Sequence, residues 1–248
     1  MLGKAFTNME IKNPNHEHDY TFVVPCYNEV KNLPKLIDAI TQYTKTMSDC
    51  KFILVENGSV DDSRIFLENL HASTHIEVIY LDQNQGYGGG IWAGVKNSQS
   101  VMTGWFHADL QIPFDDVIKM KEISKASDTS VKGRRTNRPL LDTFLTWGMS
   151  SFCSILFKTK LEDINGQPTI YESKMLRKYS SPALDFSFDL YFYIAAKKER
   201  IKLLRPKVTM VARGEGASSW NTGIKSRMRM ITRTLQYASQ LRLRNQND

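Results

Sequence analysis

The amino-acid sequence predicts an α/β protein with a mostly parallel central sheet flanked by helices. Short apolar, β-branched segments alternate with segments of helical spacing in the first half of the chain, which is the pattern of repeated strand–helix units. Polar clusters follow the strand segments, and parallel sheets gather their ligands at the carboxyl ends of the strands. The 248 residues, 41% of them hydrophobic, suffice for one large core.

Five segments have the composition of strands. The first, YTFVVP, is rich in β-branched and aromatic residues and is stopped by Pro25. The second, CKFILVENG, ends at Gly58. The predicted strands comprise residues 20–25, 50–58, 76–81, 102–109 and 129–135.

Segments of helical spacing separate these strands. Residues 30–45 carry four leucines and isoleucines that fall on one face of a helix. The second half of the chain is less regular, with an extended segment expected at 201–213. Further helices are expected at 61–73, at 84–100, from 113 onward, at 139–158, at 171–179 and at 185–198.

We expect three parts: a loose leader at 1–19, one α/β domain at 20–220, and a basic amphipathic helix at 221–248. The last part contains six lysines and arginines but a single acid, Asp248. Such a helix can lie on an anionic membrane, pack on the α/β domain or form a dimer contact. The sequence leaves these alternatives, and the oligomeric state, open.

The charge and the cysteines narrow the class of protein. A net charge of +7 favours anionic partners such as nucleotide phosphates or anionic lipids. Nucleic acid is not expected, because no RNP-like motif or zinc finger is present. Three widely spaced cysteines and a polar start without a signal peptide favour a cytoplasmic protein. Polar residues interrupt the apolar run at 140–157, which favours a packed helix, one that can touch a membrane surface, over a membrane span.

Polar clusters follow the first two strand segments. In VVPCYNE, Glu29 comes just after the strand, where a carboxylate can accept hydrogen bonds from ribose hydroxyls. In VENGSVDDS, Glu56 and Asn57 can match the donors and acceptors of a nucleobase edge. Each cluster taken alone also suits a solvent-facing turn or a helix cap.

Two further motifs follow. NQGYGGG, from residue 84, resembles a phosphate-cradling turn without matching either common glycine motif, and close backbone packing is the alternative. FHADLQIP places His107, Asp109 and Gln111 at alternate positions. Oxygen ligands suit Mg²⁺. His107 can ligate Mn²⁺, hydrogen-bond a ribose or diphosphate, or stand as a structural histidine at a strand end.

The order of these motifs, together with KGRR at 132–135, resembles the family 2 glycosyltransferases of the GT-A fold. Within them it is most similar to the dolichyl-phosphate mannose synthase branch, which uses polyprenyl-phosphate acceptors. The resemblance covers about residues 20–135 and, more loosely, VARGEGASSW at 211–220. The motifs are specific as an ordered set. The resemblance implies a UDP- or GDP-sugar donor and a Mg²⁺ or Mn²⁺ ion.

The resemblance also implies residue roles. The family pattern Asp-Ala-Asp-Leu-Gln surrounds the metal and the diphosphate, which makes Asp109 and Gln111 the implied metal ligands. His107 departs from that pattern, and Glu56-Asn57 stands where the family commonly has Asp-Asp. The implied donor-binding residues are Pro25, Tyr27, Glu29, Glu56, Asn57, Gly86, His107, Ala108, Asp109 and Arg134.

Three residues carry implied catalytic roles: Asp109, Asp189 and Arg213. Breaking the glycosidic bond leaves negative charge on the diphosphate, which a cation and arginines can stabilise. Arg213 matches a family arginine that contacts phosphate. A hydroxyl acceptor needs a base, and the expected carboxylate is Asp189, predicted to share a helical face with Asp185.

The leading hypothesis is an inverting, cation-assisted glycosyltransferase that moves a sugar from a nucleotide donor to a polyprenyl (dolichyl-like) phosphate. One alternative is transfer to a hydroxyl of a growing surface polysaccharide or glycan. A second alternative, prompted by His107, is a non-catalytic nucleotide-sugar binding protein. We expect a cytoplasmic location, peripheral on the inner face of a membrane.

Overall fold

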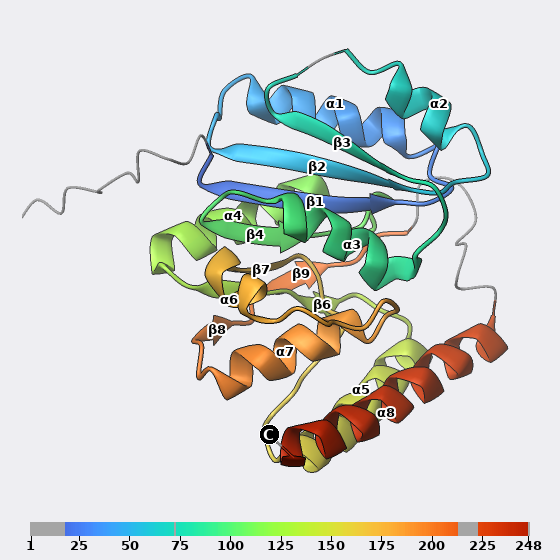
Figure 1. The fold of residues 1–248 in the computed structure, drawn as a ribbon, viewed down its shortest axis with the longest axis vertical. Helices are drawn as coiled ribbons and strands as arrows, with labels where there is room; N and C mark the ends of the chain where they lie inside the picture. Colours follow the sequence, from blue (N-terminus) through green and yellow to red (C-terminus); the bar gives the residue numbers. More distant parts are fainter. Residues whose placement is uncertain (1–17, 72, 213–222, 248) are drawn as a thin grey trace, which may run out of the picture.

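A seven-stranded sheet in the order β3-β2-β1-β4-β7-β5-β8 forms the centre of the protein (Figure 1). The computed structural model describes residues 18–71, 73–212 and 223–247. The strands of this sheet are β1 (Tyr20–Cys26), β2 (Cys50–Asn57), β3 (Ile76–Leu81), β4 (Met102–Trp105), β5 (Ser130–Lys132), β7 (Thr169–Glu172) and β8 (Leu203–Leu204). Two more strands, β6 (Arg134–Thr136) and β9 (Lys207–Thr209), pair in parallel as a small second sheet.

Helices cover both faces of the large sheet. Alternate residues of β1 separate the two layers, since Phe22 and Val24 pack toward α1, α2 and α4, whereas Val23 packs toward α3, α6 and α7. The predicted α/β class is confirmed. The helices are α1 (Leu33–Thr44), α2 (Ser63–Glu68), α3 (Gly86–Asn97), α4 (Phe114–Ser127), α5 (Leu140–Phe157), α6 (Ser173–Lys178), α7 (Phe188–Lys198) and α8 (Ile224–Asn247).

The four strands of the first half run parallel, so their carboxyl ends meet at one edge. Cys26 at the end of β1 pairs with Glu56 of β2, and Val23 pairs with Trp105 at the end of β4. The loops that follow these strands therefore lie next to one another. The polar clusters predicted from the sequence lie at this edge of the sheet.

Two predicted elements differ from the structure, and the extended segment 201–213 agrees with it. The predicted strand 129–135 is split at Gly133, where the chain leaves the large sheet for the small one. A Cβ on Gly133 would lie 2.4 Å from the backbone oxygen of Gln167. The predicted helix 171–179 begins instead as β7, which pairs antiparallel with both β4 and β5. The extended segment 201–213 contains two short strands, β8 and β9.

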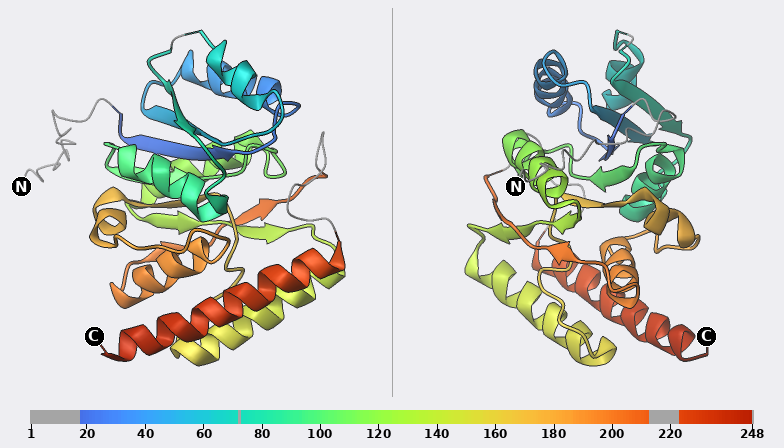
Figure 2. Two further views of the ribbon diagram at one scale, coloured as in Figure 1. Left: turned by 45° about the vertical axis from the view of Figure 1, so that its right-hand side comes forward. Right: turned by 90° about the vertical axis from the view of Figure 1, so that its left-hand side faces the viewer.

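Helices α5 and α8 lie side by side at the end of the molecule below α7 (Figures 1 and 2). Met149 and Cys153 of α5 pack with Ala238 and Leu241 of α8 and with residues of α7 in a separate apolar cluster. The predicted C-terminal helix is thus present. The predicted leader 1–19 and the boundary at 220 fall largely outside the described residues, and the three-part division stays a prediction.

Candidate active site

A cleft of about 410 Å³ opens beyond the carboxyl end of β4, between the sheet and the α5–α8 layer. Its walls come from the loop after β4, from β6 and the loop that follows, from the loop before β7 and from the first turns of α5, α7 and α8. Its polar and aromatic lining residues include Tyr87, His107, Asp109, Gln111, Arg135, Arg138, Asp142, Asn165, Gln167, Phe186, Asp189 and Arg227.

The loops after β1 and β2 are hydrogen-bonded together beside this cleft. The backbone N–H groups of Asn28 and Glu29 donate to the hydroxyls of Ser59 (3.1 Å) and Ser63 (2.9 Å). In return, Asn28 Oδ1 accepts from the backbone N–H of Val60 at 2.9 Å. These bonds fix the two loops as one unit. The predicted donor residues Pro25, Tyr27, Glu29, Glu56 and Asn57 all belong to these neighbouring strand ends.

Glu56 is fully buried at the end of β2. Its Oε1 accepts the backbone N–H of Ser59 at 2.6 Å. Its Oε2 lies 3.7 Å from an Arg64 guanidinium nitrogen and accepts no hydrogen bond from the described residues. A buried carboxylate oxygen without a hydrogen-bond donor is unfavourable by about 1–3 kcal/mol. This oxygen is therefore open to a hydrogen-bond donor from a ligand.

Asn57 holds the turn that leads into α3. Its Nδ2 donates to the Gly86 carbonyl at 3.0 Å, and its Oδ1 accepts from the Gln85 backbone at 3.0 Å. Gly86 has φ +80°, and a Cβ there would lie 2.6 Å from the Leu184 carbonyl oxygen. The glycine-rich segment therefore serves close packing in the described structure. Base recognition by Asn57 stays a prediction, with its amide already engaged by the turn.

The end of β4 brings His107, Asp109 and Gln111 to the cleft. The Asp109 carboxylate accepts the Gln111 backbone N–H at 3.1 Å, which holds it at the cleft wall. The His107 ring stacks on Tyr87 with 5.3 Å between centroids, and Tyr87 stacks on Phe186 at 4.6 Å. The side chain of Ala108 packs into the core, so any ligand contact from this residue would come from its backbone.

The donor set at this position suits a metal ion that arrives with a diphosphate. Within residues 18–71, 73–212 and 223–247, no three His, Cys, Asp or Glu side chains gather closely enough to hold an ion by themselves. Asp109 and His107 nevertheless share the cleft wall. Mg²⁺ is commonly bound by one or two carboxylates plus substrate phosphates and water, without an all-protein cage. Asp109 therefore fits a shared site of this kind.

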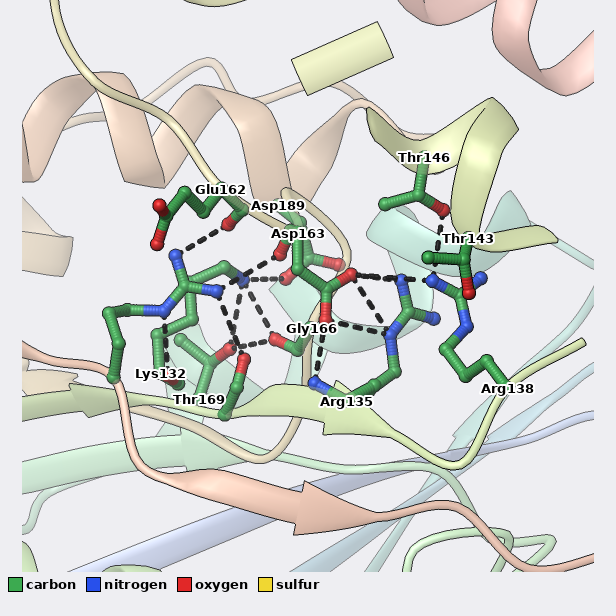
Figure 3. A network of polar contacts seen from close by, with 12 residues as sticks. Lys132, Arg135, Arg138, Thr143, Thr146, Glu162, Asp163, Gly166, Thr169 and Asp189 are labelled. Atoms are coloured by element: carbon green, nitrogen blue, oxygen red, sulfur yellow. Dashed lines mark hydrogen bonds and ion pairs between the residues drawn. The ribbon is translucent and has the colours of Figure 1, made fainter. Parts of the chain in front are cut away.

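Asp189 lies in the first turn of α7. Its side chain is buried, and its carboxylate accepts hydrogen bonds from three donors. Lys132 Nζ (3.2 Å) and Trp105 Nε1 (3.1 Å) donate to its Oδ1, and the Tyr87 hydroxyl donates to its Oδ2 at 2.9 Å. Figure 3 shows Asp189 beside Lys132, in the wider polar network that includes Asp163. The expectation that Asp185 shares a helical face with it is wrong. The helix begins only at Phe188, and Asp185 instead accepts the Ser187 backbone N–H in the preceding turn.

Lys132 is the cation of this network, and the sequence assigned it no role. It is fully buried and also donates to the Gly166 carbonyl (3.0 Å) and to the Thr169 hydroxyl (3.1 Å). Burial lowers the pKa of Lys132 to about 8, with the Asp189 carboxylate opposing that shift. The only sequence feature that pointed to Lys132 was its position near the carboxyl end of a predicted strand.

Three arginines gather on the α5–α8 side of the cleft. Arg135 binds Asp163 through its guanidinium and its backbone N–H. Burial opposes ionisation of Asp163, yet the charge and hydrogen bonds of Arg135 hold its pKa at about 2. Arg138 donates to Thr146 and lies 3.8 Å from Asp163, and Arg227 pairs with Asp142 at 2.7 Å. Three guanidinium groups thus face two carboxylates (Figure 3 shows the Arg135 and Arg138 part).

The family of the chain follows from comparison with known proteins. Residues 21–185 match the model of glycosyl transferase family 2. The chain belongs to this family. The predicted family is therefore confirmed, and the cleft described above lies at the edge where its strand-end motifs meet.

Relatives of this glycosyltransferase include enzymes with polyprenyl-phosphate acceptors. It is 30% identical over 119 residues to the undecaprenyl-phosphate 4-deoxy-4-formamido-L-arabinose transferase of Proteus mirabilis (strain HI4320), which covers 47% of this chain and 36% of that protein. It is 31% identical over 121 residues to the transferase of the same name from Yersinia pestis (strain Pestoides F), which covers 48% and 37%. The matched region thus spans little more than a third of those relatives.

Solved structures share the fold of this glycosyltransferase. Glucosyl-3-phosphoglycerate synthase from Mycobacterium tuberculosis, in complex with Mn²⁺, uridine diphosphate and phosphoglyceric acid, superposes with a TM-score of 0.69 at 15% identity. The match covers 91% of this chain and 78% of the synthase. The complex of the same synthase with phosphoglyceric acid alone gives a TM-score of 0.68 over 89% and 80%. The predicted GT-A fold is confirmed.

The structure places the predicted site residues in two neighbouring groups. His107, Asp109, Gln111 and Asp189 line the cleft, whereas the donor residues of β1 and β2 lie on the adjacent strand ends. Arg134 is exposed and its neighbour Arg135 lines the cleft, since successive residues of a strand face opposite sides. Arg213 lies outside the described residues.

Proposed function

We propose that this glycosyltransferase moves a sugar, with inversion, from a nucleotide-sugar donor to a polyprenyl phosphate. One observation supports this most strongly. The acidic and imidazole side chains at the end of β4, Asp109 and His107, share a single cleft with Arg135, Arg138 and Arg227. One group suits a metal-bound diphosphate, and the other suits a second anion.

The donor would occupy the strand ends. Glu29 and Glu56 lie on the joined loops after β1 and β2, where carboxylates can accept hydrogen bonds from ribose hydroxyls and base donors. A Mg²⁺ or Mn²⁺ ion, when bound with Asp109 and Gln111 as its protein ligands, would neutralise charge on the leaving diphosphate. The relatives that act on undecaprenyl phosphate support the same assignment by analogy.

The acceptor would be an anion at the arginine side of the cleft. A phosphate oxygen attacks the anomeric carbon as the bond to the diphosphate breaks, and no proton has to be removed. A hydroxyl acceptor would need a base. The expected base, Asp189, has both oxygens engaged by Tyr87, Trp105 and Lys132. That arrangement suits a buried counter-ion, and it favours phosphate over a glycan hydroxyl as the acceptor.

The proposal is tested in two stages. Thermal unfolding in the presence of UDP-, GDP- and dTDP-sugars with Mg²⁺ or Mn²⁺ should show a concentration-dependent rise in Tm for one donor class. That donor is then incubated with undecaprenyl phosphate, and the lipid fraction is analysed for a glycosylated product. Turnover should disappear in Asp109→Asn while folding is retained.

The outcomes separate the alternatives. A product formed on a glycan but absent from undecaprenyl phosphate would replace the proposed acceptor with a hydroxyl. Donor binding without any turnover, for every acceptor class, would identify a nucleotide-sugar binding protein. A chain that binds none of the three donor classes would contradict the proposal altogether.

A further inference from the structure

Helix α5 presents an apolar face to solvent. Within the described residues it is the one helix long and apolar enough to cross a membrane, yet only 17% of it is buried. Met149, Ser150 and Cys153 form its buried side. The exposed large side chains are Leu140 (89%), Leu141 (48%), Phe144 (65%), Trp147 (64%), Phe152 (42%) and Ile155 (79%).

Three of these exposed residues define an apolar stripe on one side of α5. Phe144, Trp147 and Ile155 recur at helical spacing on the side opposite Met149 and Cys153. The Phe144 and Trp147 rings lie 6.1 Å apart between centroids. Exposed large apolar side chains gathered on one helix face mark an interaction surface, and tryptophan is enriched where proteins meet the membrane–water interface.

Helix α8 adds positive charge beside this stripe. It lies along α5 in both views of Figure 2, and an ion pair between Arg227 and Asp142 (2.7 Å) joins their first turns. Residues 224–247 contain no aspartate or glutamate. Arg229 and Arg233 are exposed. The basic residues of α8 are Lys225, Arg227, Arg229, Arg233, Arg242 and Arg244.

We propose that the α5–α8 pair docks the protein onto the surface of an anionic lipid bilayer. The exposed stripe of α5 enters the boundary between headgroups and acyl chains, and the cations of α8 contact lipid phosphates. This inference stands on exposure and charge and does not depend on the proposed sugar transfer.

Two other occupants of the stripe fit the structure less well. Crossing the membrane would require α5 to leave α7 and α8, against which Met149 and Cys153 pack. A second copy of the chain would bring the same basic, acid-free α8 close to itself, and like charges across an interface are unfavourable. An anionic lipid surface complements both the apolar stripe and the cations.

Docking in this orientation would also place the cleft at the membrane. Arg138 just before α5, Thr146 in α5 and Arg227 in the first turn of α8 all line the cleft. This orientation would bring a lipid-linked phosphate to the arginine side of the cleft. Only this consequence of docking rests on the proposed function.

The test is flotation of the purified chain with phosphatidylcholine vesicles, with and without phosphatidylglycerol. We expect binding only to vesicles that contain the anionic lipid, and a blue shift of tryptophan emission that Trp147→Phe removes. The double variant Phe144→Ser/Trp147→Ser should lose binding. Its matched control, Val60→Ser/Ile65→Ser, replaces two exposed apolar residues of the α2 region (85% and 58% exposed) and should bind normally.

The charge contribution is tested separately. Arg229→Glu/Arg233→Glu should weaken binding by at least about fivefold for each cation removed, whereas Lys35→Glu/Lys45→Glu, two exposed positions near α1, should have a much smaller effect. Light scattering of each variant gives the oligomeric state. Equal binding by wild type and Phe144→Ser/Trp147→Ser, no binding to anionic vesicles, or a dimer that this variant converts to monomer would each overturn the proposal. None of these measurements involves a sugar donor.

Discussion

Replacing Lys132 with methionine removes the cation from a fully buried pair. The Lys132 and Asp189 side chains are both 0% exposed, and Nζ lies 3.2 Å from Oδ1. Removing one partner of such a pair leaves an uncompensated buried charge, which lowers the free energy of unfolding by about 3–5 kcal/mol. Trp105 and Tyr87 still donate to the carboxylate. We therefore expect Lys132→Met to lose about 3 kcal/mol.

Urea denaturation at neutral pH measures this loss. The matched control is Lys51→Met, which breaks a 2.6 Å pair with Glu77 whose side chains are 34% and 38% exposed. Exposed pairs of this kind contribute less than about 1 kcal/mol. The double variant Lys132→Met/Asp189→Asn should recover part of the loss, because no buried charge remains without a partner. If Lys132→Met were no less stable than Lys51→Met, the buried pair would not hold this region together.

The same lysine makes stability depend on pH. Its pKa in the folded protein is about 8, below the ordinary value of 10.5. Between these values the unfolded chain binds more protons than the folded chain, so the free energy of unfolding rises with pH. The advantage of wild type over Lys132→Met should therefore increase between about pH 8 and 10. An advantage that stays flat or shrinks over this range would show that burial does not depress the lysine's pKa.

Three further predictions concern the cleft and its supports. Gly86→Ala should lower the free energy of unfolding by about 1–3 kcal/mol by urea denaturation, because φ is +80° and the new Cβ meets the Leu184 carbonyl. Asn57→Ala should lower the free energy of unfolding by about 1–3 kcal/mol, because the turn before α3 loses its amide hydrogen bonds. The same variant should bind the donor more weakly in calorimetry. Unchanged donor affinity would show that the turn does not shape the site. His107→Asp should strengthen the Mn²⁺-dependent part of UDP binding measured by calorimetry, because a second carboxylate joins Asp109. An unchanged Mn²⁺-dependent part would show that residue 107 does not face the ion.

The sequence could predict the sheet and its polar edge because both depend on local pattern. The strands β1 and β2 are mostly apolar runs; Glu56 is the penultimate residue of β2, and Glu29 lies three residues after the end of β1. Strand β7 could not be recognised in this way. Its four residues are a strand because β4 and β5 flank them, and pairing partners distant in the chain are not visible in a local window.

The side chains around the cleft were harder to predict than its backbone. Arg135, rather than Arg134, lines the cleft because the chain turns at Gly133 into a second sheet. Arg227 reaches the cleft from a helix more than 80 residues after β6, through its pair with Asp142. Such convergence depends on tertiary packing. The number of basic residues at 221–248 therefore predicted the positive charge of this segment, but it could not predict that Arg227 lines the cleft.

His107, which stands where the resemblance implies an acid, has a structural role in the cleft. Its ring stacks on Tyr87, and the hydroxyl of that tyrosine donates to Asp189 and contacts the Gln167 amide. The carboxyl end of β4 is thus joined by packing to the buried Lys132–Asp189 pair, of which Asp189 lines the cleft. An aspartate at position 107 could not make this stack. A change at this residue should therefore alter both the donor side of the cleft and the placement of Tyr87, and activity measurements on such variants need the unfolding free energy beside them.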